Sequence, residues 1–175
     1  MSRYRRAKTS GGTYFFTVTL ADRSSDLLVR HVDLLHRAYG SVQKRYPFET
    51  IAICIFPDHL HAIWSLPAGD ADFPLRWSLI KSGFSRSFPA APSRSSSKTA
   101  KREKGIWQRR YWEHLIRDSS DLERHVDYIH FPVKHGLVPR VHDWRHSSFH
   151  DHVARGMLPP DWGGDICDIT GSFGE

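Results

Sequence analysis

Two histidines separated by one residue lie in the stretch Phe56-Pro-Asp-His-Leu-His-Ala-Ile-Trp-Ser-Leu66. The stretch predicts a tight turn at Phe56 to Asp58, followed by a strand that begins near His59. Because side chains alternate between faces along a strand, His59 and His61 point the same way, roughly 6.5 Å apart along the backbone. Two imidazoles at that separation can hold one divalent cation. A pair of half-exposed strand histidines without a metal explains the same spacing.

A second chemical group is Tyr128, on a predicted helix that begins at the capping-box sequence Ser120-Asp-Leu-Glu123 and runs to about His130. At about 100° per residue, Tyr128 lies roughly 130° from the middle of the apolar stripe of this helix. That stripe consists of Leu122, Val126, Ile129 and Val133. Tyr128 is therefore not placed as an ordinary core tyrosine, and it is either a surface residue or a residue with a chemical task.

The elements that must position these groups follow the order strand, helix, strand, strand, helix, strand. The strands are predicted at 13–20, 49–56, from His59 and at 106–116, and the helices at about 26–46 and from Asp72. This order predicts an α+β fold, a ferredoxin-like or RRM-like βαββαβ sheet with helices on one face and an added helix for the tyrosine. We expect the other face to be open for a ligand, with His59 and His61 on it.

The composition fits one domain and an anionic partner. The 175 residues suffice for one well-buried core, and the net charge of +6 favours a polyanion. No run of 18 apolar residues occurs, and Cys54 and Cys167 form no CxxC pair, so we expect a cytoplasmic protein without a membrane partner. We expect the main domain at 1–138, with a mobile basic loop at about 89–105, and an irregular tail at 139–175 packed on that domain.

Basic residues beside aromatic ones are candidate nucleic-acid contacts. Between Ile106 and Ile116, rings that can stack on bases alternate with guanidiniums that can bind phosphates. The competing interpretation is an edge strand whose rings belong to the core, and the basic loop is equally compatible with simple solvation. The candidate DNA-binding residues are Arg3, Arg5, Arg6, Lys81, Arg86, Arg109, Arg110, Trp112 and Lys134.

Several motifs in one order resemble a known family. FPDHLHAIW, IKSGFSR, GIWQRRYWEH and HVDYIHFPVKHGLV, with the opening YRRAKTSGGTYFFTVTLADR and the closing DWRHSSFHDHVARGMLPPDWG, are similar to the REP-associated tyrosine transposases. These belong to the single-tyrosine HUH nuclease group, and the similarity spans almost the whole chain. It implies a catalytic domain that nicks and rejoins single-stranded DNA at hairpin-forming repeats. It also implies a bacterial cytoplasmic enzyme, nucleoid-associated when acting, and we expect a monomer rather than a dimer.

Carried over by position, the resemblance implies that His59 and His61 ligate Mg²⁺ or Mn²⁺ and that Tyr128 forms a 5′-phosphotyrosine. Two imidazoles favour Mn²⁺. One position departs from the family, which places an asparagine or glutamine one helical turn after the tyrosine as a third metal ligand. Here that position is Pro132, and the chain has no asparagine. His130 and Gln108 are weak substitutes, so the third ligand stays open.

Two further points remain open in the sequence. A non-catalytic single-stranded nucleic-acid-binding module could use the same RRM-like sheet. The tail contains four histidines around Trp144 without cysteines or a strong metal-binding spacing, and we assign them to packing and DNA contact. They are His142, His146, His150 and His152.

Overall fold

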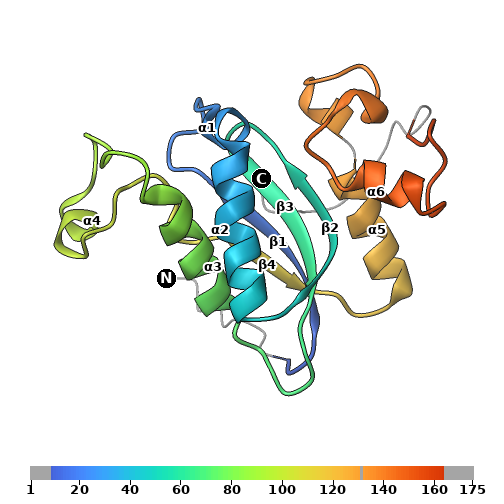
Figure 1. Cartoon of the computed structure of the whole chain (residues 1–175), viewed down its shortest axis with the longest axis horizontal. Helices are drawn as coiled ribbons and strands as arrows, with labels where there is room; N and C mark the ends of the chain where they lie inside the picture. The colour runs from blue at the N-terminus through green and yellow to red at the C-terminus, as the bar shows by residue number, and fades with distance from the viewer. Residues whose placement is uncertain (1–8, 131, 164–175) are drawn as a thin grey trace.

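The computed structural model describes residues 9–130 and 132–163, which form a four-stranded sheet with helices on both sides (Figure 1). No helix among these residues is long and apolar enough to cross a membrane. The elements in chain order are β1 (Thr13–Thr19), α1 (Leu27–Arg30), α2 (Val32–Arg45), β2 (Glu49–Ile55), β3 (His59–Ser65), α3 (Phe73–Ser85), α4 (Ser96–Ala100), β4 (Trp112–Leu115), α5 (Ser119–Ile129), η1 (Pro132–His135), η2 (Val141–Asp143) and α6 (Phe149–Ala154).

The strand order is β2-β3-β1-β4, and each neighbouring pair is antiparallel. The helices α1 and α2 join β1 to β2 across β3, and α3 joins β3 to β4 across β1. Two interleaved connections of this kind define the split βαβ arrangement. The predicted ferredoxin-like βαββαβ fold is therefore confirmed.

The main core lies between one face of the sheet and the helices α2 and α3. The predicted alternation of the strands holds, because the side chains buried on this face are Tyr14, Phe16, Val18, Leu60, Ala62 and Trp64. The predicted stripe of α3 packs against them, and the rings of Trp64 and Trp77 stack with centroids 4.2 Å apart. The side chain of Asp72 caps α3 by accepting a hydrogen bond from the Leu75 N–H.

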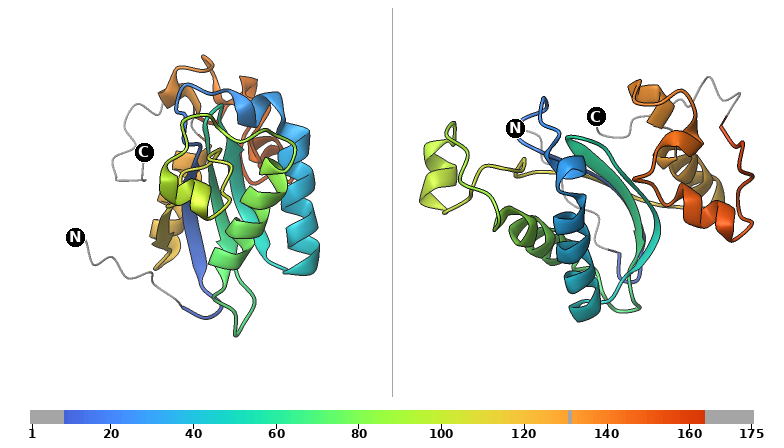
Figure 2. Two further views of the ribbon diagram at one scale, coloured as in Figure 1. Left: turned by 90° about the vertical axis from the view of Figure 1, so that its left-hand side faces the viewer. Right: turned by 45° about the horizontal axis from the view of Figure 1, so that its top comes forward.

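The opposite face, predicted to be open, is covered. The helix α5 lies against it, and residues 146–148 run antiparallel beside the edge strand β2 (Figure 2). The Ile55 N–H donates to the carbonyl of His146, and the Ser148 N–H donates to that of Ile53, both at 2.8 Å. A second apolar cluster forms under α5 from Phe15, Ala52, Cys54, Phe56, Ile63, Tyr128 and Ile129. The prediction is wrong because burying the apolar side of α5 requires this face of the sheet.

Several predicted boundaries also differ from the structure. The long helix before Pro47 is divided at His31 into α1 and α2. The strand predicted at 106–116 is shorter in the structure, where only β4 is a regular strand. Trp107 forms an isolated bridge to Leu20, the residue after β1, but residues 109–111 do not pair with the sheet. The predicted loop at 89–105 contains the short helix α4, capped by Ser95. Its mobility and the domain boundary at 138 stay predictions.

Candidate active site

The two strand histidines lie side by side on the covered face of β3. Both are buried, with 3% of His59 and none of His61 exposed. The Nδ1 of His59 donates to the carboxylate of Asp58 at 2.8 Å, and the Nδ1 of His61 is hydrogen-bonded to Thr17 Oγ1 at 2.9 Å. Hydrogen bonds of this kind fix the orientation and tautomer of metal-binding histidines. Nε2 of each ring is then the nitrogen that can ligate a metal.

A third imidazole completes the group. His135, at the end of η1, has its ring centroid 5.2 Å from that of His59 and 6.4 Å from that of His61. One nitrogen from each of the three rings lies within 4.8 Å of the others. The rings of His59 and His61 meet at 71°, so their in-plane lone pairs can converge on one point.

The chemistry of this group suits a transition-metal ion. Burial, and then the neighbouring His135, keep the pKa of His61 well below its ordinary value. Burial, and then His59, lower the pKa of His135 to about 4. Neutral imidazoles are the form that binds metal, and three of them favour Mn²⁺ or Zn²⁺ over Mg²⁺.

The candidate nucleophile packs directly on this group. The ring of Tyr128 lies 5.1 Å from that of His61 and 6.1 Å from that of Phe15, and only 3% of the residue is exposed. The ammonium of Lys134 lies 4.6 Å from the centre of the tyrosine ring. The predicted placement of Tyr128 away from the core, and with it the alternative of a surface tyrosine, is therefore wrong: the ring belongs to the second apolar cluster, since α5 buries a wider face than its apolar stripe indicates.

Asp121 fixes the helix α5 to the sheet. Its buried carboxylate accepts hydrogen bonds from His114 Nε2 on β4 at 2.8 Å, from the Arg117 N–H at 3.0 Å and from the Arg124 side chain at 3.2 Å. Burial acts to raise the pKa of Asp121, but the hydrogen bonds outweigh it and lower this pKa to about 2. The helix begins at Ser119 and is capped by Asp118, whose side chain accepts a hydrogen bond from the Asp121 N–H, so the predicted cap at Ser120 is wrong.

His114, Asp121 and His125 also bring three potential metal-binding atoms close together. The two imidazoles, however, stack almost parallel, at 12° and 4.6 Å between centroids. The lone pairs of two stacked rings lie in separate, nearly parallel planes, so that they do not converge on one ion. The geometry therefore indicates a hydrogen-bonded network that positions α5, rather than a second metal site.

The predicted DNA-binding residues are spread over several parts of the molecule. Arg3, Arg5 and Arg6 lie outside the described residues. Lys81, Arg86 and Arg109 line a pocket beside α3, on the α2 and α3 side of the sheet. Arg110 is exposed, and Trp112 on the edge strand β4 is 40% exposed. Trp112 pairs with Thr17, which in turn pairs with His61, so the side chains of Trp112 and His61 lie on the same face of the sheet. Lys134 lies over the candidate nucleophile.

The other candidates for a metal ligand lie elsewhere. His130 is fully buried and its Nε2 is hydrogen-bonded to Ser148 Oγ, while Gln108 belongs to the pocket beside α3. In the tail, His152 is hydrogen-bonded to the Ile51 carbonyl and His150 to the Trp144 carbonyl. These contacts agree with a packing role for both.

His135 is a candidate site residue that the sequence reasoning missed. It follows Tyr128 by seven residues, beyond Pro132, so that helical periodicity could not relate the two. The available signal was its place in the motif FPVKHG, directly after the departure from the family pattern. Asp58 and Thr17 were also missed. The signal for Asp58 was its place directly before His59 in the sequence, whereas Thr17 is recognised only from its pairing with His61 in the sheet.

Comparisons with known proteins find relatives over almost the whole chain. No family model matches the chain. Two relatives carry the name REP-associated tyrosine transposase: one from Haemophilus influenzae is 48% identical over 167 residues, 94% of this chain and 95% of its own length. The other, from Escherichia coli K12, is 46% identical over 171 residues, 97% and 96% of the two chains. A solved REP-associated tyrosine transposase bound to a REP hairpin is 46% identical, covers 100% of this chain and 98% of its own, and has a TM-score of 0.85.

Proposed function

Because the chain belongs to the REP-associated tyrosine transposases, we propose that it nicks and rejoins single-stranded DNA beside hairpin-forming repeats through a covalent tyrosine intermediate. The observation that carries this proposal is the packing of Tyr128 on His61, within a group of three buried or half-buried imidazoles. A phenol against a candidate metal site is the arrangement that tyrosine-mediated cleavage of a phosphodiester needs.

Tyr128 supplies the nucleophile. Its phenolic oxygen gives up a proton to water and attacks the scissile phosphorus, so that the Tyr Oη–P bond forms while the P–O3′ bond breaks. The departing 3′-oxygen takes up a proton, and the DNA remains attached as a 5′-phosphotyrosine. Attack by a 3′-hydroxyl on this linkage reverses the steps and joins the strands. The ammonium of Lys134 on the ring face stabilises the negative charge that develops on the phenol.

His59, His61 and His135 are the residues that would hold a divalent ion. When bound, the ion would polarise the phosphate and offset its developing charge. Asp58 and Thr17 orient two of the ligands, and Phe56 packs on the ring of His135 at 4.4 Å between centroids. We propose Mn²⁺ rather than Mg²⁺ because all three ligands are nitrogen atoms.

A covalent-adduct assay tests the proposal. The protein is incubated with Mn²⁺ and a labelled DNA oligonucleotide that contains a hairpin with unpaired flanks, and is then separated on a denaturing gel. Tyr128→Phe should abolish the labelled protein band and leave hairpin binding within about twofold of wild type, whereas the control Tyr46→Phe should retain the band. A wild-type protein that binds the hairpin without any adduct would instead support the non-catalytic binding module.

We propose that a monomer is the working unit, acting on DNA in the bacterial cytoplasm, because the fold of one chain already packs Tyr128 against His61. The molecular mass of the DNA complex in solution tests the oligomeric state, because a monomer predicts one protein chain per hairpin.

A further inference from the structure

A basic pocket lies between α3 and residues 101–111, away from the histidine site. It has a volume of about 520 Å³, and six of the side chains that line it are cationic, against one carboxylate, that of Glu103. Residues 101–105, which follow α4, line one side of it. In Figures 1 and 2 the segment that contains α4 and the helix α5 lie on opposite sides of the molecule. The pocket is therefore a second place at which a polyanion could be bound.

Two lysines of the pocket are held in place by the protein. Lys81 donates to the carbonyl of Gln108 at 3.0 Å, and its ammonium lies 5.0 Å from the ring centre of Tyr111 and 5.8 Å from that of Trp107. Lys104 donates to the carbonyls of Arg86 and Phe88 at 2.9 and 2.6 Å. Because carbonyls and rings carry no net charge, they position the ammonium groups while leaving the positive potential of the pocket intact.

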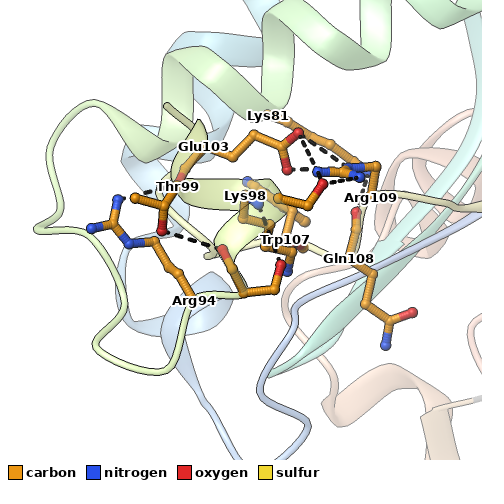
Figure 3. Close-up of polar contacts among 10 residues, drawn as sticks. Lys81, Arg94, Lys98, Thr99, Glu103, Trp107, Gln108 and Arg109 are labelled. Carbon is orange, nitrogen blue, oxygen red and sulfur yellow. Dashed lines mark hydrogen bonds and ion pairs between the residues drawn. The ribbon is translucent and has the colours of Figure 1, made fainter. Parts of the chain in front are cut away.

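Arg109 is held differently, because its partner is the acidic residue. Its guanidinium donates to the carboxylate of Glu103 at 3.0 to 3.4 Å and to the hydroxyl of Ser97 at 3.3 Å (Figure 3). Arginine binds carboxylates and phosphates with the same fork of N–H donors. The pair is partly exposed, with 44% of the arginine and 34% of the glutamate side chain accessible, so an incoming phosphate can reach it.

We propose that this pocket binds a backbone phosphate of the DNA, and that Glu103 holds Arg109 until the phosphate displaces its carboxylate. The inference rests on the proposed function, because it takes DNA as the ligand. The segment 109–111 leads directly from the pocket into β4, which is an edge strand of the sheet. A DNA strand can therefore pass from the tyrosine face around this edge, along exposed Arg110 and Trp112, to the pocket.

The proposal predicts two opposite effects, and each has a control with the same change in net charge. Glu103→Gln should bind a fluorescein-labelled DNA hairpin with unpaired flanks about two- to fivefold more tightly, since it removes the competing carboxylate. Lys81→Gln should bind more weakly and reduce the slope of log Kd against log salt concentration by about one, as expected for one lost phosphate contact. The controls are Glu49→Gln and Lys44→Gln, both at exposed positions away from the pocket.

Binding is measured by fluorescence anisotropy without metal, so that no cleavage contributes, and the covalent adduct is measured separately. The proposal is overturned if Glu103→Gln gains no more affinity than Glu49→Gln, or if the salt slope of Lys81→Gln equals that of Lys44→Gln. In that outcome wild-type binding and adduct formation at Tyr128 would still stand. A wild type that fails to bind the hairpin overturns the proposed function as well.

Discussion

Asp121→Asn is a nearly isosteric change for which the structure predicts a clear loss of stability. Asp121→Asn removes a charge and keeps the shape of the side chain, which is 3% exposed at the N-terminal end of α5. The lowering of its pKa from 3.8 to about 2 corresponds to about 2 kcal/mol of stability at pH 7. We therefore expect the free energy of unfolding of the variant to fall by about this amount.

The pH dependence of this loss identifies its cause. Because the pKa of Asp121 is lower in the folded than in the unfolded protein, its contribution is complete above about pH 4 and is lost as the pH falls through about 2. The difference between wild type and Asp121→Asn should thus shrink to about half near pH 3. Urea denaturation at pH 7, 5 and 3, followed by circular dichroism, measures it.

A control on the same helix has the opposite sign. Burial, and then the charge of Glu123, raise the pKa of Asp127, so its negative charge is unfavourable in the folded protein. Asp127→Asn should therefore leave the stability at pH 7 unchanged or raise it. Equal losses of stability in the two variants, or a loss in Asp121→Asn that does not depend on pH, would show that the charge of Asp121 is not the cause.

Two other predictions concern the candidate site. His135→Ala should weaken the binding of Mn²⁺ to the protein without DNA by about 10- to 100-fold, whereas the control His150→Ala should not. Electron paramagnetic resonance of free Mn²⁺ measures the affinity, and equal affinities of the two variants would remove His135 from the metal site. Trp112→Ala should weaken the binding of unpaired DNA by about 1–3 kcal/mol. Trp112→Phe should retain most of the binding energy, because stacking needs only a ring. A phenylalanine variant that binds as weakly as the alanine variant would contradict stacking.

Local periodicity was enough to predict the sheet and one half of the site. The alternation of His59 and His61 with Leu60 and Ala62 requires only a strand, and the strand is present. The stripe of α3 and its Asp72 cap are equally local. These features depend on neighbours within a few residues, and they follow from backbone geometry alone.

The covered face could not be predicted in the same way. The buried surface of α5 includes Asp121 and His125, which are polar, so an apolar stripe underestimates it. These side chains are buried because they satisfy one another and His114 on β4, a pairing between residues of different elements. Nothing in the spacing along the chain reveals such partners.

His135 illustrates the same limit at the site itself. Its position depends on how the chain turns through η1 after Pro132, and on the ring of Phe56 against which it packs. The departure from the family pattern was visible in the sequence. That His135 lies beside His59 and His61 was visible only in three dimensions.

The phenol of Tyr128 and the three clustered imidazoles, one of which it contacts, are parts of one polypeptide. If they form the catalytic site that we propose, one copy of the protein would need no side chain from a neighbour. Among residues 9–130 and 132–163, Tyr128 is the tyrosine whose ring contacts His61, so one copy could be tethered to one DNA end at a time. A mobile segment has two ends to be cut. Its excision would consequently demand two copies at once or two consecutive turnovers of one copy, and the number of protein molecules on the DNA would become a control point.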